Sequence, residues 1–437
     1  MAVVADSTTE AALENQRLGG LQLRVAALCT LVQMCDGYDV NSVGWAVPSL
    51  IRDWHLPPST FAMAFLWSSI GIMVGALFAG PIGDRLGRRP LLLASLTIFG
   101  IASLLSALVG SLGMLGLLRF FTGIGIGGGF SGAAALTGDY TPNRLRATMI
   151  MATFTGAPLG GFVGGQIVAF LLAEWGWRMI FVLGGIFPLA LLPVLMLWLP
   201  ESPRFLAARR NLSPRNAALL RRFDITSAQS DAIDVARSNP IWMLFGREYA
   251  LQTLLLWIIF FCSLLNLFLF VYWMPTVLNL IGISPAQAVF AASLRDLGAI
   301  FAVLYLGLAI DRIGPERALA LHYAAGAAFI AVISLFALPY SALCVIIFLA
   351  GMTIIGSQTG VNGACGKLYP ARMRTSGIGW ALGFGRLGGI VAPVLGGYLL
   401  AVDLPPTHIF LVACLFALIA ATATALLVFR NNRGEST

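Results

Sequence analysis

Two aspartates lie three residues apart inside an apolar stretch near the start of the chain. Asp36 and Asp39 belong to "MCDGYDVNSVGW" (34–45), which follows the apolar run "RVAALCTLVQ". Residues i and i+3 share one face of a helix, so both carboxyl groups are expected to face one space. Two carboxylates this close in an apolar setting cannot both ionise at low cost, which suits a group that takes up and releases a proton. The alternative is a structural pair held by a helix end or by arginines.

Two arginines lie in equally apolar surroundings. Arg119 is followed by Gly123 and Gly127 at i+4 and i+8, and Arg386 lies in "GFGRLGGIVAP". A guanidinium matches a carboxylate through two parallel hydrogen bonds, which favours an organic acid over a sugar as ligand. We expect at least one of the two to bind a substrate carboxylate. The alternative is that they are ion-pair partners of the aspartates.

Aromatic and amide side chains in the same apolar stretches are candidates for the remainder of a binding site. These substrate-site candidates are Tyr38, Asn266, Tyr272, Trp273, Gln358 and Asn362. Aromatic residues also crowd membrane interfaces and packed cores, and buried amides also join helices, so each has a structural alternative.

The composition shows which elements must position these residues. Hydrophobic residues make up 58% of the 437 residues and charged residues only 11%, and the mean hydropathy is +0.87. A soluble protein carries about 25% charged residues, so this is a polytopic helical membrane protein. Twelve apolar spans are expected, near 22–49, 60–82, 90–110, 112–136, 146–173, 178–199, 247–276, 286–310, 317–337, 340–365, 375–401 and 407–429.

Basic residues gather in alternate loops, and this pattern predicts the orientation. Arginines follow the second, fourth, sixth and eighth spans, and those after span six include Arg204, Arg209, Arg210, Arg215, Arg221 and Arg222. The positive-inside rule places these loops and both termini in the cytoplasm. The net charge of +8 therefore indicates topology, not a nucleic-acid surface.

The two halves of the chain repeat each other. "GDRLGRRP" (83–90) recurs as "IDRIGPER" (310–317), and "YTPNRLRAT" (140–148) as "YPARMRTS" (369–376). A parallel repeat of six helices is typical of a transporter with its substrate site between two bundles. We therefore predict an all-α membrane protein of twelve transmembrane helices in two six-helix bundles.

Several motifs resemble those of one family of transporters. "GPIGDRLGRR" (80–89) resembles the cytoplasmic loop signature of the major facilitator superfamily, "PESPR" (200–204) its end-of-bundle motif, and "RFFTGIGIGGG" (119–129) its span-four motif. "DGYD" with "TGDYTPNRLRAT" is similar to the aromatic acid:proton symporters. The resemblance implies proton-coupled import of benzoate-type or hydroxybenzoate-type acids, with no cofactor besides the coupling proton.

The charged loop motifs are expected to form a cytoplasmic gate. Its predicted members are Asp84, Arg85, Arg88, Asp139, Arg144, Arg146, Asp311 and Arg312. Such a cluster can lock the cytoplasmic side while the outside is open. The alternative is that these residues only set topology.

The predicted domains are a cytoplasmic tail (1–20), an N-terminal bundle (21–199), a cytoplasmic linker (200–246), a C-terminal bundle (247–430) and a second tail (431–437). We expect a functional monomer in the bacterial inner membrane, with a small aromatic acid and the lipid bilayer as its partners and no nucleic acid or metal. The sequence has no recognisable catalytic cluster, so we do not expect an enzyme. Alternatives are a symporter of another organic acid or of a sugar, and a drug–proton antiporter.

One feature departs from the family pattern. "SLRDLG" (293–298) places Arg295 and Asp296 inside the eighth span, where the family more often carries neutral residues. Two interpretations stay open, namely a mutually satisfied pair near the outer surface or a feature specific to the substrate.

Overall fold

The computed structural model describes most of the chain. The described residues are 18–207, 209, 216–218, 220, 244–246, 249–368, 371–402 and 404–434. Within these ranges the side chains of residues 143, 147, 304, 311, 362–368, 371–376, 378 and 429–434 lie outside the description.

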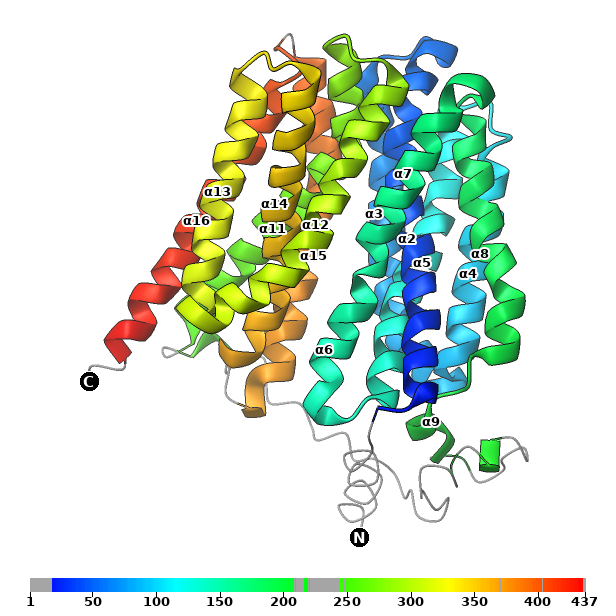
Figure 1. The fold of residues 1–437 in the computed structure, drawn as a ribbon, viewed down its shortest axis with the longest axis vertical. Coiled ribbons are helices and arrows are strands. Elements are labelled where there is room, and N and C mark those ends of the chain that lie inside the picture. The colour runs from blue at the N-terminus through cyan, green and yellow to red at the C-terminus, as the bar shows by residue number, and fades with distance from the viewer. Residues whose placement is uncertain are drawn as a thin grey trace.

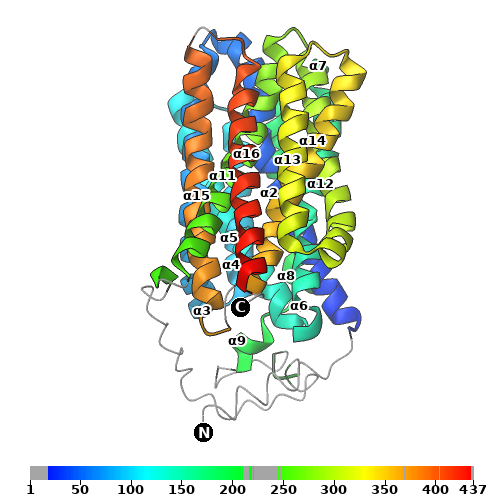
Figure 2. The same cartoon turned by 90° about the vertical axis from the view of Figure 1, so that its left-hand side faces the viewer.

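Long helices that run nearly parallel form two groups, one from each half of the sequence (Figure 1). The first group, which we call the N-half, contains α2 (Gly20–Trp54), α3 (Ala62–Leu86), α4 (Arg88–Ser106), α5 (Leu112–Tyr140), α6 (Asn143–Phe154), α7 (Gly156–Trp175) and α8 (Arg178–Trp198), with the 3-10 turn η1 (Pro58–Phe61) and the short α9 (Pro203–Ala207). The second group, the C-half, contains α11 (Ala250–Leu280), α12 (Pro285–Ile313), α13 (Pro315–Leu335), α14 (Tyr340–Leu368), α15 (Ala371–Ala401) and α16 (His408–Gly434). The view at right angles shows the helices of both groups aligned with the same long axis (Figure 2).

Eleven spans in the described part of the chain are long and apolar enough to cross a membrane. They correspond to the second to twelfth predicted spans. The remaining helix, α2, has 35 residues but carries two aspartates, an asparagine and a glutamine in its middle. The helical membrane fold is confirmed, whereas the count of twelve spans stays a prediction.

The sequence repeat has a counterpart in the backbone. Gly87 joins α3 to α4 with φ 110°, and Gly314 joins α12 to α13 with φ 83°. Residues with a Cβ rarely adopt such positive φ values, so glycine is the residue that allows each tight turn. The two glycines occupy the same place in "GDRLGRRP" and "IDRIGPER". Each half therefore makes the same turn between its second and third long helix.

The fifth predicted span, 146–173, is interrupted in the structure. α6 ends at Phe154 and α7 begins at Gly156. A Cβ on Gly156 would lie 2.4–3.1 Å from atoms of Thr30 and Gln33, which belong to α2. This glycine therefore lets the interrupted helix approach α2 closely. Thr155 between the two helices keeps helical dihedral angles (φ −64°, ψ −16°), so the interruption is one residue long and Arg144–Trp175 remains one apolar span.

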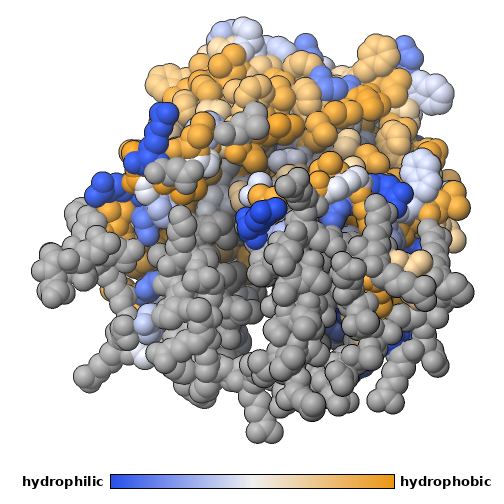
Figure 3. All heavy atoms as spheres, turned by 60° about the horizontal axis from the view of Figure 1, so that its bottom comes forward, coloured by the Kyte–Doolittle hydropathy of each residue, from blue (hydrophilic) through white to orange (hydrophobic). Residues whose placement is uncertain are grey.

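The two ends of the bundle differ in charge. One end, which we call the basic end, carries Arg85, Arg88, Arg89, Arg144 and Arg204, and α2 begins and α16 ends there (Figure 1). Seen toward this end, hydrophobic residues cover the flank and hydrophilic residues gather along the rim beside the grey atoms (Figure 3). Large hydrophobic side chains such as Leu77, Phe170 and Leu308 are exposed, as expected for a lipid-facing surface.

Candidate functional site

Asp39 and Arg119 form a buried ion pair inside the N-half. Arg119 Nη1 lies 3.2 Å from Asp39 Oδ2, and both side chains are 1% exposed. Ser103 Oγ donates a hydrogen bond to Asp39 Oδ1 at 2.9 Å, and Arg119 Nη2 donates to Ser106 Oγ at 2.9 Å. The guanidinium also lies 5.0 Å from the centre of the Phe181 ring. In this structure Arg119 is therefore the ion-pair partner of Asp39. Contact between Arg119 and a substrate carboxylate stays a prediction.

Asp36 has a different environment on the same helix. It is 2% exposed, and neither carboxyl oxygen has a hydrogen-bond partner among the described residues. A Cβ on Gly129 of α5 would lie 3.2 Å from Asp36 Oδ2, so the carboxyl group faces bare backbone. Both aspartates point toward α5, as their spacing predicted. A carboxylate without a partner is costly to bury, so this site accommodates the neutral acid at lower cost.

Arg386 is a partly buried arginine of the C-half. Its side chain is partly buried in α15, and it makes no hydrogen bond or ion pair with any described residue. Gly389 lies one turn further along α15, where a Cβ would approach the Phe268 ring to 2.8 Å. The Phe268 ring is 5.4 Å from that of Tyr272. Arg386 thus lies one helical turn from the residue of α15 that packs against the Phe268–Tyr272 pair.

The aromatic candidates of α11 join the two halves. The Tyr272 ring stacks on Phe65 of α3 at 4.6 Å, and its hydroxyl lies 3.2 Å from Ser69 Oγ. Trp273 meets the same Phe65 ring edge-on at 5.1 Å and packs against Gly396. These rings are fully buried, so in this structure they close the contact between α3 and α11. Their predicted role in substrate binding is untested.

The other substrate-site candidates lie in separate places. Tyr38 donates a hydrogen bond to the Ile180 carbonyl at 2.8 Å and packs edge-on against Trp45, which is a packing role within the N-half. Asn266 is 2% exposed in α11, and its Oδ1 has no partner among the described residues. Gln358 is buried in α14, whereas the side chain of Asn362 lies outside the described residues.

The predicted gate motif is tied to a residue that the sequence analysis did not single out. Asp84 and Arg88 form an ion pair at 2.7 Å, with the Asp84 side chain 67% exposed. Glu201 Oε1 accepts hydrogen bonds from the backbone N–H groups of Arg88 at 2.8 Å and Arg89 at 3.2 Å. Glu201 therefore caps the first turn of α4 with a negative charge, which the helix dipole favours. Its position in the "PESPR" motif was the signal that could have revealed it.

Asp139 extends this charged cluster to the end of α5. Its Oδ2 accepts a hydrogen bond from Ser202 Oγ at 2.7 Å, and its Oδ1 lies 3.9 Å from Arg204 Nε. Arg146 lies against Gly138, where a Cβ would be 2.9 Å from Arg146 Nε.

The remaining gate candidates are less connected to this cluster. Arg85 is exposed, and its carbonyl accepts a hydrogen bond from Arg209. Arg144 and Arg312 are exposed at the basic end, and the side chain of Asp311 lies outside the described residues. The cluster is thus built within the N-half, and its predicted copy in the C-half stays a prediction.

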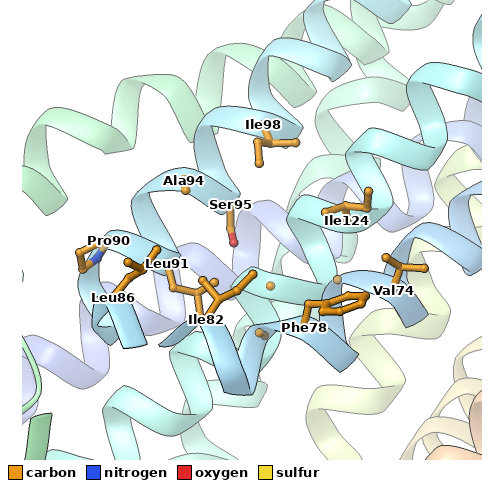
Figure 4. Close-up of a pocket in the computed structure, with 13 residues that line it drawn as sticks. Val74, Phe78, Ile82, Leu86, Pro90, Leu91, Ala94, Ser95, Ile98 and Ile124 are labelled. Atoms are coloured by element: carbon orange, nitrogen blue, oxygen red, sulfur yellow. The ribbon is translucent and has the colours of Figure 1, made fainter. Parts of the chain in front are cut away.

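A pocket of about 420 Å³ lies beside the gate motif, with Leu86 and Pro90 in its lining, and none of the proton-coupling or substrate-site candidates lines it (Figure 4). Its walls come from α3, α4 and α5, and include Val74, Phe78, Ile82, Leu91 and Ile98. Ser95 is its one side chain with a polar atom. A carboxylate would find no cation there, so we do not assign substrate binding to this pocket. Among the residues that the structure describes, no group of three or more His, Cys, Asp or Glu side chains could hold a metal ion.

Comparisons with known proteins agree with this architecture. The family model of the Major Facilitator Superfamily matches residues 29–293 and 256–437. The chain is 35% identical over 416 residues to a gallate transporter of Pseudomonas putida, covering 94% of this chain and 93% of the relative. It is 33% identical to the 4-hydroxybenzoate transporter PcaK of Pseudomonas aeruginosa, covering 90% and 89%.

Solved structures give the same fold. A crystal structure of a D-xylose–proton symporter superposes with a TM-score of 0.70 over 92% of this chain and 97% of that chain, at 17% sequence identity. The family model and the two relatives each span most of the chain. The protein is therefore a multi-pass membrane transporter that belongs to the major facilitator superfamily, not an enzyme.

Proposed function

We propose that this transporter imports an aromatic carboxylate together with at least one proton. The observation that carries the proposal is Arg386, a partly buried cation with no partner among the described residues. A guanidinium in such a place is costly without an anion, and a carboxylate would satisfy it through two parallel hydrogen bonds. Relatives named for gallate and 4-hydroxybenzoate transport support a substrate with this chemistry, since both acids carry a carboxylate on a hydroxylated ring.

The neighbouring residues of α11 suit the remainder of such a substrate. Phe268 packs against Gly389, one turn from Arg386, and lies beside Tyr272, and aromatic rings prefer stacked or edge-on partners. The unpartnered Oδ1 of Asn266 is an acceptor for a ring hydroxyl. We therefore assign the carboxylate to Arg386 and the ring to α11, with Trp273 and the polar residues Gln358 and Asn362 as further candidates.

Asp36 is our candidate for the proton carrier. Its unpartnered carboxyl group accommodates a proton without the loss of an ion pair, whereas Asp39 is held by Arg119. Moving one negative charge inward against 100 mV, inside negative, costs about 2.3 kcal/mol, and one accompanying proton removes this cost. Asp39 then acts with Arg119 as a fixed charged pair beside the carrier.

In the proposed cycle the basic end faces the cytoplasm, as the positive-inside rule predicts. The N-terminal bundle predicted over 21–199 and the C-terminal bundle predicted over 247–430, joined by the linker 200–246, would rock about a site at mid-membrane. The contacts that Tyr272 and Trp273 make with α3 would then close the outer side, and the Asp84–Arg88–Glu201 cluster would act when the cytoplasmic side closes. We further propose that the protein acts as a monomer, without a cofactor, in a bacterial inner membrane.

Binding of a benzoate-type acid and of its neutral amide to purified protein tests the substrate class. We expect 4-hydroxybenzoate to bind and 4-hydroxybenzamide to bind at least tenfold more weakly. Arg386→Lys should weaken acid binding by about 30-fold or more, because loss of a buried charged contact costs about 2–5 kcal/mol and an ammonium lacks the planar fork. The exposed Arg312→Lys is the matched control and should bind like the wild type. Equal affinity for acid and amide would contradict the carboxylate assignment and favour a drug–proton antiporter.

A further inference from the structure

Arg295 and Asp296 are adjacent, buried residues of α12 that meet the opposite half of the protein. Their side chains are 1% and 6% exposed, and Arg295 Nη2 lies 2.9 Å from Asp296 Oδ2. The same Nη2 donates a hydrogen bond to Asn41 Oδ1 of α2 at 2.6 Å. The charged partner of Arg295 thus lies on its own helix, and its neutral partner lies across the interface between the halves.

The second wall of this contact comes from α7. A Cβ on Gly161 would lie 2.5 Å from Asp296 Oδ2 and 2.8 Å from Asn41 Nδ2, so the α7 backbone covers these two side chains. Nearer the end of the bundle, Gln166 Nε2 of α7 donates a hydrogen bond to Ser293 Oγ of α12 at 2.7 Å. Polar contacts therefore join α12 to both α2 and α7.

The Arg295–Asn41 hydrogen bond lies toward the end of the bundle opposite the basic end, as do the Tyr272 and Trp273 rings that join α11 to α3. Arg295 is ten residues from Pro285, the first residue of α12, or about 15 Å along the helix from the end opposite the basic end. Trp54, the last residue of α2, lies at that opposite end as well. The hydrogen bond therefore belongs to the part of the interface that must open when the transporter exposes its other side.

We propose that the Arg295–Asn41 hydrogen bond is a closing contact of the transport cycle, and that Asp296 neutralises Arg295 when this contact opens. The proposal rests on the alternating access of the proposed function and is independent of which substrate is carried. If the counter-charge of Arg295 lay on α2, opening would separate a buried ion pair, which is costly. With Asp296 on α12, opening breaks a hydrogen bond to a neutral amide and leaves the ion pair whole.

This arrangement predicts that Asp296→Asn and the exchange of Asn41 with Asp296 shift the ratio of open to closed forms in opposite directions. Asp296→Asn leaves Arg295 without a counter-charge in the closed interface, so the open form should gain population. Exchanging the two side chains, Asn41→Asp with Asp296→Asn, moves the counter-charge across the interface and should favour the closed form. Asn41→Ala removes the cross-interface acceptor without changing any charge, and should favour the open form.

The test is a distance measurement by double electron–electron resonance on the full chain, in a background with the six native cysteines replaced by alanine. Spin labels at Glu174 of α7 and Gln287 of α12, both exposed, report the separation of the two helices near the end opposite the basic end. Without substrate, Asn41→Ala should raise the ratio of open to closed populations at least tenfold. The exchanged double variant should lower this ratio below that of the wild-type background.

Gln166→Ala is the matched control, because it removes a neutral hydrogen bond between the same two halves. We expect it to change the ratio by less than threefold. If Asp296→Asn does not fold, Asn41→Ala and the exchanged variant still decide the question. Wild-type distances in both of these variants, or shifts in the same direction, would overturn the proposal. Since no substrate is added, a failure to transport aromatic acids leaves this result unaffected.

Discussion

Asp39→Asn should destabilise the protein, and the destabilisation should be relieved by a second substitution at Arg119. The Arg119 guanidinium is buried against Asp39, Ser103 and Ser106, so removal of the carboxylate charge leaves a buried cation without compensation. Removing one partner of a buried ion pair typically costs about 3–5 kcal/mol. Replacing both partners with uncharged residues is often neutral, so Asp39→Asn with Arg119→Leu should recover most of the lost stability.

The assay is the midpoint temperature of unfolding of detergent-purified protein, followed by size-exclusion chromatography after heating. The expected order is wild type, then the double variant, then Asp39→Asn as the least stable. Asp36→Asn serves as the matched control, because this carboxyl group has no partner to lose among the described residues. The reasoning is refuted if Asp39→Asn unfolds at the wild-type temperature, or if adding Arg119→Leu lowers the midpoint further.

Three further predictions concern coupling and the charged cluster at the basic end. Asp36→Asn should abolish uptake against a gradient while exchange of substrate across the membrane continues, and accumulation at the wild-type level would contradict its role as proton carrier. Asp84→Ala should slow turnover while substrate affinity changes less than threefold. Because the Asp84 side chain is largely exposed, the loss of its ion pair should change the free energy of unfolding by about 1 kcal/mol or less. A large loss of affinity would place Asp84 in the binding site. Glu201→Ala should lower stability by about 0.5–2 kcal/mol, the usual cost of a lost helix cap, whereas an unchanged unfolding midpoint would show that the α4 cap contributes little.

The membrane architecture was readable from the sequence because its signals are local. Long apolar stretches define the helices, and the offset between "GDRLGRRP" and "IDRIGPER" places Gly87 and Gly314 at equivalent turns. The close packing of Gly156 against Thr30 of α2 could not be predicted, because it depends on how closely these helices approach each other. A hydropathy pattern contains no information on that approach.

The candidate site was readable in its members but not in its pairings. The spacing of Asp36 and Asp39 predicted a shared face, and the structure turns both toward α5. Which aspartate meets Arg119 depends on the rotation and height of α2 against α5, and these follow from packing between residues 80 positions apart. One aspartate is consequently satisfied and the other is left without a partner.

Longer-range contacts were further out of reach. Asn41 stands two residues after Asp39, yet its partner Arg295 is 254 positions away and in the other half. Of the two interpretations left open for Arg295 and Asp296, the structure has the mutually bonded pair. Glu201 similarly bonds to Arg88, 113 positions away. The short "PESPR" motif contains Glu201 but does not show that this residue caps α4.

The central claim is that transport of an aromatic carboxylate is coupled to protons, and it is tested most directly with purified protein in sealed liposomes. Labelled 4-hydroxybenzoate is present at equal starting concentration on both sides of the membrane, and a proton gradient directed inward is imposed. Accumulation should rise above equilibrium with the gradient, disappear when a protonophore is added, and be absent in Asp36→Asn. Accumulation that is insensitive to the protonophore, or efflux of the acid driven by the inward proton gradient, would contradict proton-coupled import.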